Sequence, residues 1–288
     1  MTNRDIEIEY DTFGDPDESP LLLIMGFTAQ MTAWPEPFCA QLADAGHYVI
    51  RFDNRDCGLS SKTAGTPPNV MAMMMSALAG NPVEGAPYTL SDMATDAMAV
   101  LDALEIDAAH VAGASMGGMI AQQTAIDHPD RVRSLVSIMS TTGDPSVGQG
   151  KPEVTSALLA TPPADRDGAI RRNVDLGRVI SGPLFDEELA REAAAAAYDR
   201  SFHPIGAAFQ LAAMMASGDR TPRLRQLPHS TLVIHGEADP LITPSGGEAT
   251  AEAIPGAELL MLEEMGHDLP RPLWPTFVEA IKRLTSAA

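Results

Sequence analysis

The chain has 288 residues, of which 45% are hydrophobic and 5% aromatic, and its formal net charge at pH 7 is -20. This length and composition are typical of a globular protein with a sizeable core, built as one α/β domain or as a core domain with a small insertion. The negative charge disfavours binding to nucleic acid or to anionic membrane surfaces, since both depend on clustered Lys and Arg side chains. We therefore expect a small-molecule ligand, with no nucleic-acid or membrane partner.

The N-terminal segment, residues 1–10, is polar and acidic and lacks the basic start and apolar stretch of a secretory signal. No apolar run approaches the length of a membrane span. The two cysteines, Cys39 and Cys57, are too few for a disulfide framework and do not have metal-site spacing. These features predict a cytoplasmic protein with two free thiols.

Apolar, β-prone runs alternate with helical patterns along most of the chain. This alternation predicts βαβ units that build a mostly parallel central sheet with helices on both faces, the α/β class. A short alternating run at residues 6–10 predicts an edge strand. Inner strands are predicted at residues 21–25, 48–52, 110–113, 135–139, 231–235 and 259–262.

The clearest helical pattern covers residues 90–104, where apolar side chains recur every three or four positions. Thr89 precedes it as a cap residue and Asp92 follows three positions later, which is capping-box spacing. A second helix is predicted over residues 116–127, because Pro129 disfavours helical geometry in the residue before it.

Between residues 142 and 227 the strand signals stop, and helical stretches are broken by prolines and glycines. The strand pattern resumes at residue 231, so this segment interrupts one sheet and does not start an independent domain. We predict a core domain of residues 1–141 and 228–288 with an inserted helical cap, or lid, of residues 142–227.

Residues 113–117 read Gly-Ala-Ser-Met-Gly, a G-x-S-x-G match between a predicted strand and a predicted helix. At such a turn the serine adopts a strained backbone conformation that exposes its Oγ. Side chains at Gly113 and Gly117 would collide across the turn. Ser115 is therefore the candidate nucleophile.

A serine hydroxyl is a poor nucleophile at neutral pH, so it needs a base within hydrogen-bonding distance and a third group that orients the base. Of the seven histidines, His267 is best placed, because it follows the last predicted strand and lies beside Gly266 in a loop. His235 lies within an apolar strand and is predicted to be a core histidine.

Two aspartates compete for the role of the orienting acid. Asp239 follows the predicted strand 231–235 after three residues, whereas Asp144 follows the preceding strand. Glu237 lies too close to the strand to turn freely, and Asp268 adjoins the histidine but points elsewhere. We favour Asp239 and keep Asp144 as the alternative.

Acyl chemistry at a serine also requires rigid N–H donors for the oxygen that becomes negative in the tetrahedral intermediate. The N–H of Met116 is one candidate for this oxyanion hole. The second is the N–H of Phe27, since Gly26 permits a sharp turn after strand 21–25. The side chain of Phe27 is predicted either to line the acyl site or to join the core.

Residues 69–80 contain a methionine cluster of Met71, Met73, Met74 and Met75. Such a cluster is typical of adaptable core packing, with a substrate surface as the alternative. If apolar cap residues face it, the pocket suits lipophilic acyl or aryl groups. No phosphate loop or metal-ligand cluster accompanies it, so no cofactor or metal is expected. The candidate substrate-binding residues are Met74, Phe209, Met214 and Met215.

These motifs resemble the α/β-hydrolase family along nearly the whole chain, the cap excepted. The resemblance rests on the nucleophile turn, on segments 128–132, 236–239 and 265–267, and on the serine, acid and histidine order. It implies a Ser115, His267 and Asp239 catalytic triad and an acyl-enzyme intermediate, as in carboxylesterases that act on small to medium lipophilic esters. A cofactor-free perhydrolase, a lactonase, a carbon–carbon bond hydrolase or a ligand receptor with little turnover are the alternatives.

Two departures from the usual family pattern resemble the aclacinomycin methylesterase group of polyketide-tailoring esterases. Met25-Gly26 stands where the family often has His-Gly, and residues 55–60 read Arg-Asp-Cys-Gly-Leu-Ser in place of Arg-Gly-x-Gly-x-Ser. Asp53 adds to this similarity. The resemblance implies a methyl ester of a bulky substrate.

Overall fold

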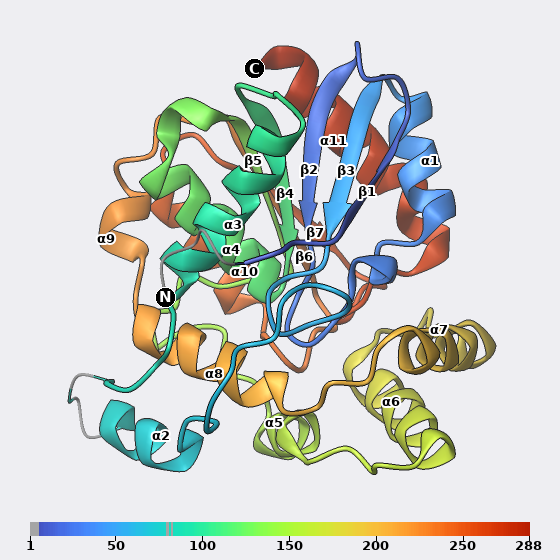
Figure 1. Ribbon diagram of the computed structural model, residues 1–288. Helices are drawn as coiled ribbons and strands as arrows, with labels where there is room; N and C mark the ends of the chain where they lie inside the picture. The colour runs from blue at the N-terminus through green and yellow to red at the C-terminus, as the bar shows by residue number, and fades with distance from the viewer. Residues whose placement is uncertain (1–5, 79–80, 82) are drawn as a thin grey trace.

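The computed structural model describes residues 6–78, 81 and 83–288. Residues 1–5 of the polar N-terminal segment and residues 79–80 of the methionine-rich segment lie outside this part of the chain. One seven-stranded sheet has the order β1-β3-β2-β4-β5-β6-β7. Helices cover both of its faces (Figure 1), which confirms the predicted α/β class.

The strands β2 to β7 run parallel, and only β1 (Tyr10–Phe13) pairs antiparallel, with β3. The strand predicted at 259–262 is present as β7, but its predicted inner position is wrong. β7 lies at the edge of the sheet, and its Leu259 is 37% exposed. The other five predicted inner strands do lie inside the sheet. The parallel strands are β2 (Ser19–Ile24), β3 (His47–Phe52), β4 (Ala109–Ala114), β5 (Val132–Ile138), β6 (Thr231–Gly236) and β7 (Glu258–Leu262).

The predicted edge strand at 6–10 is displaced, because β1 begins only at Tyr10. The backbone N–H groups of Glu7 and Glu9 donate to the hydroxyls of Ser61 and Ser60 at 2.8 and 2.9 Å. This segment therefore lies along the loop after β3 and not along a strand. The alternating pattern of residues 6–10 does not reflect pairing in the sheet.

A separate hydrophobic cluster lies on each face of the sheet, so neighbouring residues of one strand pack into different clusters. On β2, Leu22 belongs to the cluster that includes α3 and α4, whereas Leu23 belongs to the cluster that includes α1 and α11. The helices outside the segment between β5 and β6 are α1 (Glu36–Asp44), α2 (Val70–Leu78), α3 (Leu90–Ala103), α4 (Met116–Asp127), α10 (Ser245–Ala253) and α11 (Trp274–Ala287).

The two predicted helices, α3 and α4, are confirmed to within a residue. The backbone N–H of Thr89 donates to Asp92 Oδ2 at 2.8 Å, as the capping-box spacing predicted. Helix α4 ends at Asp127, with His128 as its C-cap.

Between β5 and β6 the chain forms helices and no strand. Figure 1 shows most of them on the side toward which the parallel strands point. Residues 142–227 are called the cap below; their role as a lid and their boundaries stay a prediction. Within the described residues, no helix is long and apolar enough to cross a bilayer. The helices of this segment are α5 (Pro152–Leu159), α6 (Arg166–Ile180), α7 (Glu187–Arg200), α8 (Gly206–Ser217) and α9 (Thr221–Leu224).

His110 on β4 is a buried histidine at the amino-terminal half of the sheet. Its Nδ1 lies 2.7 Å from Ser134 Oγ and its Nε2 lies 3.2 Å from Ser19 Oγ. Burial lowers the pKa of His110 from 6.5 to about 4. Between these two pH values the unfolded chain binds a proton that the folded protein does not, so the free energy of unfolding falls as the pH is lowered.

We predict that the free energy of unfolding of the His110→Gln variant falls less steeply with decreasing pH than that of the wild type. The slope of the free energy of unfolding between pH 6.5 and 4 should decrease by up to about 1.4 kcal/mol per pH unit, the value for one proton. Urea denaturation at a series of pH values measures it. A variant slope as steep as that of the wild type would contradict the assignment.

Candidate active site

Ser115 lies at the turn between β4 and α4, with φ 57° and ψ -121°. A positive φ is uncommon for a residue with a Cβ and marks local strain. The turn forms because two glycines leave room for it. A Cβ on Gly113 would lie 2.0 Å from the carbonyl oxygen of Gly117, and one on Gly117 would lie 2.1 Å from that of Ile24.

The structure brings together the three residues proposed as a triad. His267 Nδ1 lies 2.8 Å from Asp239 Oδ2, and His267 Nε2 lies 2.9 Å from Ser115 Oγ. A carboxylate only accepts, so Nδ1–H is the donor to Asp239 and Nε2 is left to accept the serine hydroxyl. His267 is 8% exposed and Asp239 is 3% exposed. This is the geometry in which an imidazole can accept the proton of a serine hydroxyl.

The carboxylate of Asp239 is itself fixed by backbone donors. Its Oδ1 accepts the N–H groups of Leu241 and Ile242 at 2.8 and 2.9 Å, which leaves Oδ2 for the histidine. The turn that carries Asp239 starts at Gly236, where a Cβ would lie 2.1 Å from the carbonyl oxygen of Met265. The loops of the acid and the histidine are therefore in direct backbone contact.

Asp144, the alternative acid, is placed elsewhere. Its Oδ1 accepts the hydroxyl and the N–H of Ser146 at 2.7 and 2.8 Å. These two hydrogen bonds, the hydroxyl first, lower the pKa of the Asp144 carboxyl. Asp268 accepts the N–H of Gly266 and does not take the position of the acid either. Of the two aspartates considered, Asp239 is the one that contacts His267.

The two predicted oxyanion donors flank the serine. Met116 is the first residue of α4, where N–H groups have no acceptor within the helix. Gly26 packs directly on the nucleophile, since a Cβ there would lie 3.0 Å from Ser115 Cβ. Among the described residues, neither the N–H of Met116 nor that of Phe27 donates a hydrogen bond. Their role at an oxyanion stays a prediction. The side chain of Phe27 is partly buried against the core.

The predicted substrate-binding residues differ in exposure. Helix α2 contacts α8, so the methionine-rich segment lies beside a cap helix. Met74, Met214 and Met215 are partly buried. Phe209 is 1% exposed and belongs to the main core cluster. Within the methionine cluster, Met73 is buried, whereas Met71 is 67% exposed.

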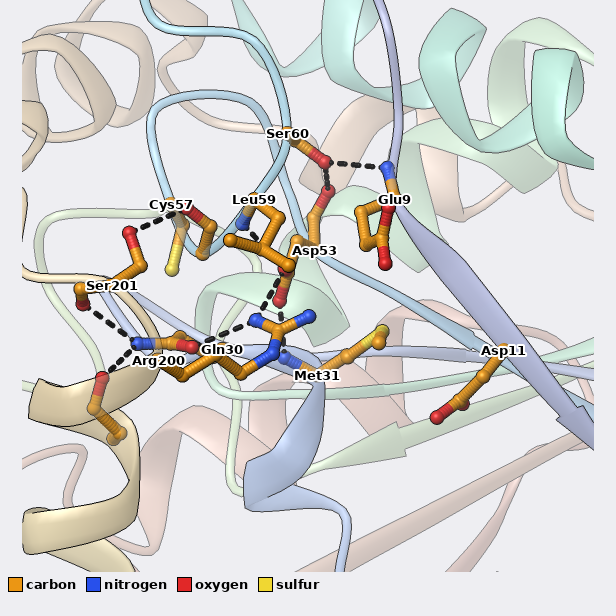
Figure 2. A network of polar contacts seen from close by, with 12 residues as sticks. Glu9, Asp11, Gln30, Met31, Asp53, Cys57, Leu59, Ser60, Arg200 and Ser201 are labelled. Carbon is orange, nitrogen blue, oxygen red and sulfur yellow. Dashed lines mark hydrogen bonds and ion pairs between the residues drawn. The ribbon is translucent and has the colours of Figure 1, made fainter.

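A polar network between cap and core was not predicted from the sequence. Figure 2 shows the carboxylate of Asp53 at its centre. Asp53 Oδ1 accepts the N–H of Met31 at 2.7 Å, and Oδ2 accepts the N–H of Leu59 at 2.8 Å. Arg200, the last residue of α7, donates to the same Oδ2 at 2.6 Å. Asp53 was noticed as a family feature, but its cap partner had no sequence signal.

Gln30 extends this network into the loop after β2. Its Nε2 donates to the carbonyl oxygens of Ala197 and Ser201 at 2.7 and 2.9 Å, and its Oε1 accepts from Arg200 at 2.7 Å. On the other side of the site, the N–H of His267 donates to the carbonyl oxygen of Ile180 at the end of α6, at 2.8 Å. The cap therefore contacts the loops of both the histidine and Phe27.

Comparison with known proteins agrees with the fold. The family model for the alpha/beta hydrolase fold matches residues 19–270. The rhodomycin D methylesterases DauP of Streptomyces sp. (strain C5) and DnrP of Streptomyces peucetius are 31% and 30% identical, over 100% of this chain and 98% of theirs. The enol-lactonase of Burkholderia xenovorans LB400 has a TM-score of 0.74 at 21% identity, with 98% of each chain covered, which is a likeness of fold.

We predict that Asp239→Asn slows the reaction of Ser115 with a serine-directed phosphonate by a factor on the order of 10³ to 10⁴, since the imidazole loses its orienting carboxylate. Asp144→Asn is the matched control and should react within about twofold of the wild type. The rate constant of inactivation measures both. Equal rates for the two variants would show that Asp239 does not activate the serine.

Proposed function

Because the chain belongs to the α/β-hydrolase family, we propose that it is a serine hydrolase that cleaves carboxylic ester bonds. The observation that carries this proposal is the hydrogen-bonded line from Asp239 through His267 to Ser115. Met116 follows Ser115 in the chain and Phe27 follows Gly26, which packs on Ser115, and the backbone N–H groups of both have no acceptor in the described part of the protein. A nucleophile, a base, an acid and oxyanion donors are the parts that acyl transfer requires.

The proposed reaction has two half-reactions. Ser115 Oγ attacks the ester carbonyl carbon while its proton passes to His267 Nε2, and the carbonyl oxygen takes up negative charge beside the N–H groups of Phe27 and Met116. The bond to the alcohol oxygen then breaks, and His267 returns the proton to that oxygen. Water next attacks the acyl-Ser115 carbonyl and loses its proton to His267. The bond from the carbonyl carbon to Ser115 Oγ then breaks, His267 returns the proton to Oγ, and the acid is released. Asp239 stays ionised throughout and stabilises the imidazolium.

The relatives favour one finer candidate, the methyl ester of a bulky polyketide-type substrate. Two methylesterases are similar over the whole chain, cap included. The departures at Met25 and at residues 55–60 point to the same group. The partly buried methionines Met74, Met214 and Met215 suit a lipophilic substrate, because methionine adapts to irregular apolar shapes.

Lactone hydrolysis and perhydrolysis use the same triad, so they are separated from ester hydrolysis only by substrate. A panel of activated esters of graded chain length, methyl esters of polycyclic acids, a lactone series and an ester with added hydrogen peroxide distinguishes them. Rapid multiple turnover of any ester would eliminate the ligand receptor. The expected result is turnover of esters without added cofactor.

We predict that Ser115→Ala lowers kcat for the best ester by a factor on the order of 10⁴ or more while the protein stays folded. The variant lacks the nucleophile but keeps the turn. Ser156→Ala, at an exposed serine of α5, is the control and should have wild-type turnover. Steady-state kinetics with circular dichroism test this. A Ser115→Ala variant with more than about a tenth of wild-type turnover would rule out the proposed nucleophile.

We predict that Met214→Ala and Met215→Ala change the preference among ester chain lengths, with each methylene contributing a factor of about 10 to 200 where it is recognised. Their rates with a small phosphonate should stay near the wild-type value. Phe209→Ala should instead reduce the free energy of unfolding by about 3 to 5 kcal/mol, because Phe209 is a core residue. An unaltered chain-length profile in the folded methionine variants would place them in the cap core and not at the substrate.

A further inference from the structure

The loop that carries Phe27 forms a tight turn with an unfavourable residue in it. The N–H of Ala29 donates to the carbonyl oxygen of Gly26 at 3.3 Å, which closes a four-residue turn. Its third residue, Thr28, has φ 57°. A positive φ at this position is characteristic of type II turns, where glycine is favoured. A β-branched residue there needs support from its surroundings.

Gln210 of the cap helix α8 supplies that support. Gln210 is 0% exposed, and its Oε1 accepts the N–H of Thr28 at 2.8 Å. Its Nε2 donates to the carbonyl oxygen of Arg55 at 2.8 Å. Because the partner at Thr28 is a donor and the partner at Arg55 is an acceptor, the orientation of the amide is determined by its neighbours. The buried amide is therefore satisfied at both ends.

Core residues hold the two ends of this loop. Asn54 Nδ2 donates to the carbonyl oxygen of Met25 at 2.7 Å, and Asp53 accepts the N–H of Met31. Gln210 holds the central peptide, the one that joins Phe27 to Thr28. Type I and type II turns differ by a reversal of this central peptide, so its hydrogen bond decides which turn forms.

We propose that Gln210 is a positioning residue of the oxyanion site. By holding the central peptide of the 26–29 turn, it fixes the backbone angles of Phe27 and through them the adjoining Gly26–Phe27 peptide, whose N–H then faces the oxygen of the tetrahedral intermediate on Ser115. The cap then takes part in the chemistry of acyl transfer and does not only control access. This inference rests on the proposed function, since the oxyanion forms only if Ser115 attacks an acyl carbon.

The first test is Gln210→Met, which keeps the length of the side chain and removes both hydrogen bonds. We expect kcat for an activated ester to fall by a factor of about 10 to 100, less than the loss of an oxyanion donor outright. KM should change by less than about threefold. The matched control is Ser217→Ala on the same helix, which removes the hydrogen bond from the N–H of Leu90 and should keep kcat within about twofold.

A second readout separates positioning from loosened structure. Sulfur is a weak hydrogen-bond acceptor, so a thionoester gains less from the oxyanion donors than the oxygen ester does. In Gln210→Met the rate ratio of ester to thionoester should fall toward one, because mainly the oxygen ester is slowed. A purely structural role would slow both substrates alike and leave the ratio at the wild-type value.

The third test acts on the other side of the hydrogen bond. Glycine adopts a positive φ without support, so in a Thr28→Gly background the change Gln210→Met should cost less of kcat than it does alone. If Gln210→Met does not fold, Gln210→Asn, whose amide is one methylene too short to reach Thr28, is measured in its place with the same expectations.

The proposal is overturned if the folded Gln210 variant has wild-type kcat, if its ester to thionoester ratio is unchanged, or if Ser217→Ala produces the same losses. These outcomes differ from failure of the proposed function itself. If the proposed function is wrong, the wild-type protein turns over no ester, or Ser115→Ala keeps its activity.

Discussion

Close backbone packing around the nucleophile turn is the constraint on which the site depends. Gly117 sits on the carbonyl of Ile24 at the end of β2, and no side chain fits between them. The register aligns the carboxyl ends of neighbouring strands. Ile24 lies opposite Gly113, and Ile138 lies opposite both Ala114 and Ile234. The loops after β2, β4 and β6 therefore leave one edge of the sheet together. Functional groups that are far apart in sequence meet there because the strands are parallel and in register.

Hydrogen bonding allows a charged group to be buried beneath this edge. Asp53 has a fully buried side chain, and burying a carboxylate is costly unless it is paired and hydrogen-bonded. Two backbone N–H groups and the guanidinium of Arg200 satisfy it. The same contacts join the loop after β2 to the end of α7. Displacing the end of α7 would leave the buried carboxylate of Asp53 without Arg200, so this contact helps to hold the cap on the core.

Sequence reasoning succeeded where the signal is local. The G-x-S-x-G turn and the capping box of α3 depend on residues a few positions apart, and both occur as predicted. The edge position of β7 could not be predicted from the sequence, because the order of strands depends on the whole sheet. The contacts of Gln210 with Thr28 and of Arg200 with Asp53 span 182 and 147 positions, and no periodicity encodes them. The sequence already favoured Asp239 over Asp144, and in the structure Asp239 contacts His267 whereas Asp144 contacts Ser146.

The cap is attached to the core on two sides. At the histidine loop the attachment includes a hydrogen bond from the N–H of His267 to the carbonyl of Ile180 and a close backbone approach at Gly182, where a Cβ would lie 2.5 Å from the carbonyl oxygen of Glu264. At the loop after β2 it depends on the side chains of Gln30 and Gln210. A chimera that receives the cap of a relative would preserve the first attachment only if a glycine stood at position 182. It would preserve the second only if Gln210 came with the new cap, since Gln30 belongs to the core, so cap exchange in this family transfers more than specificity.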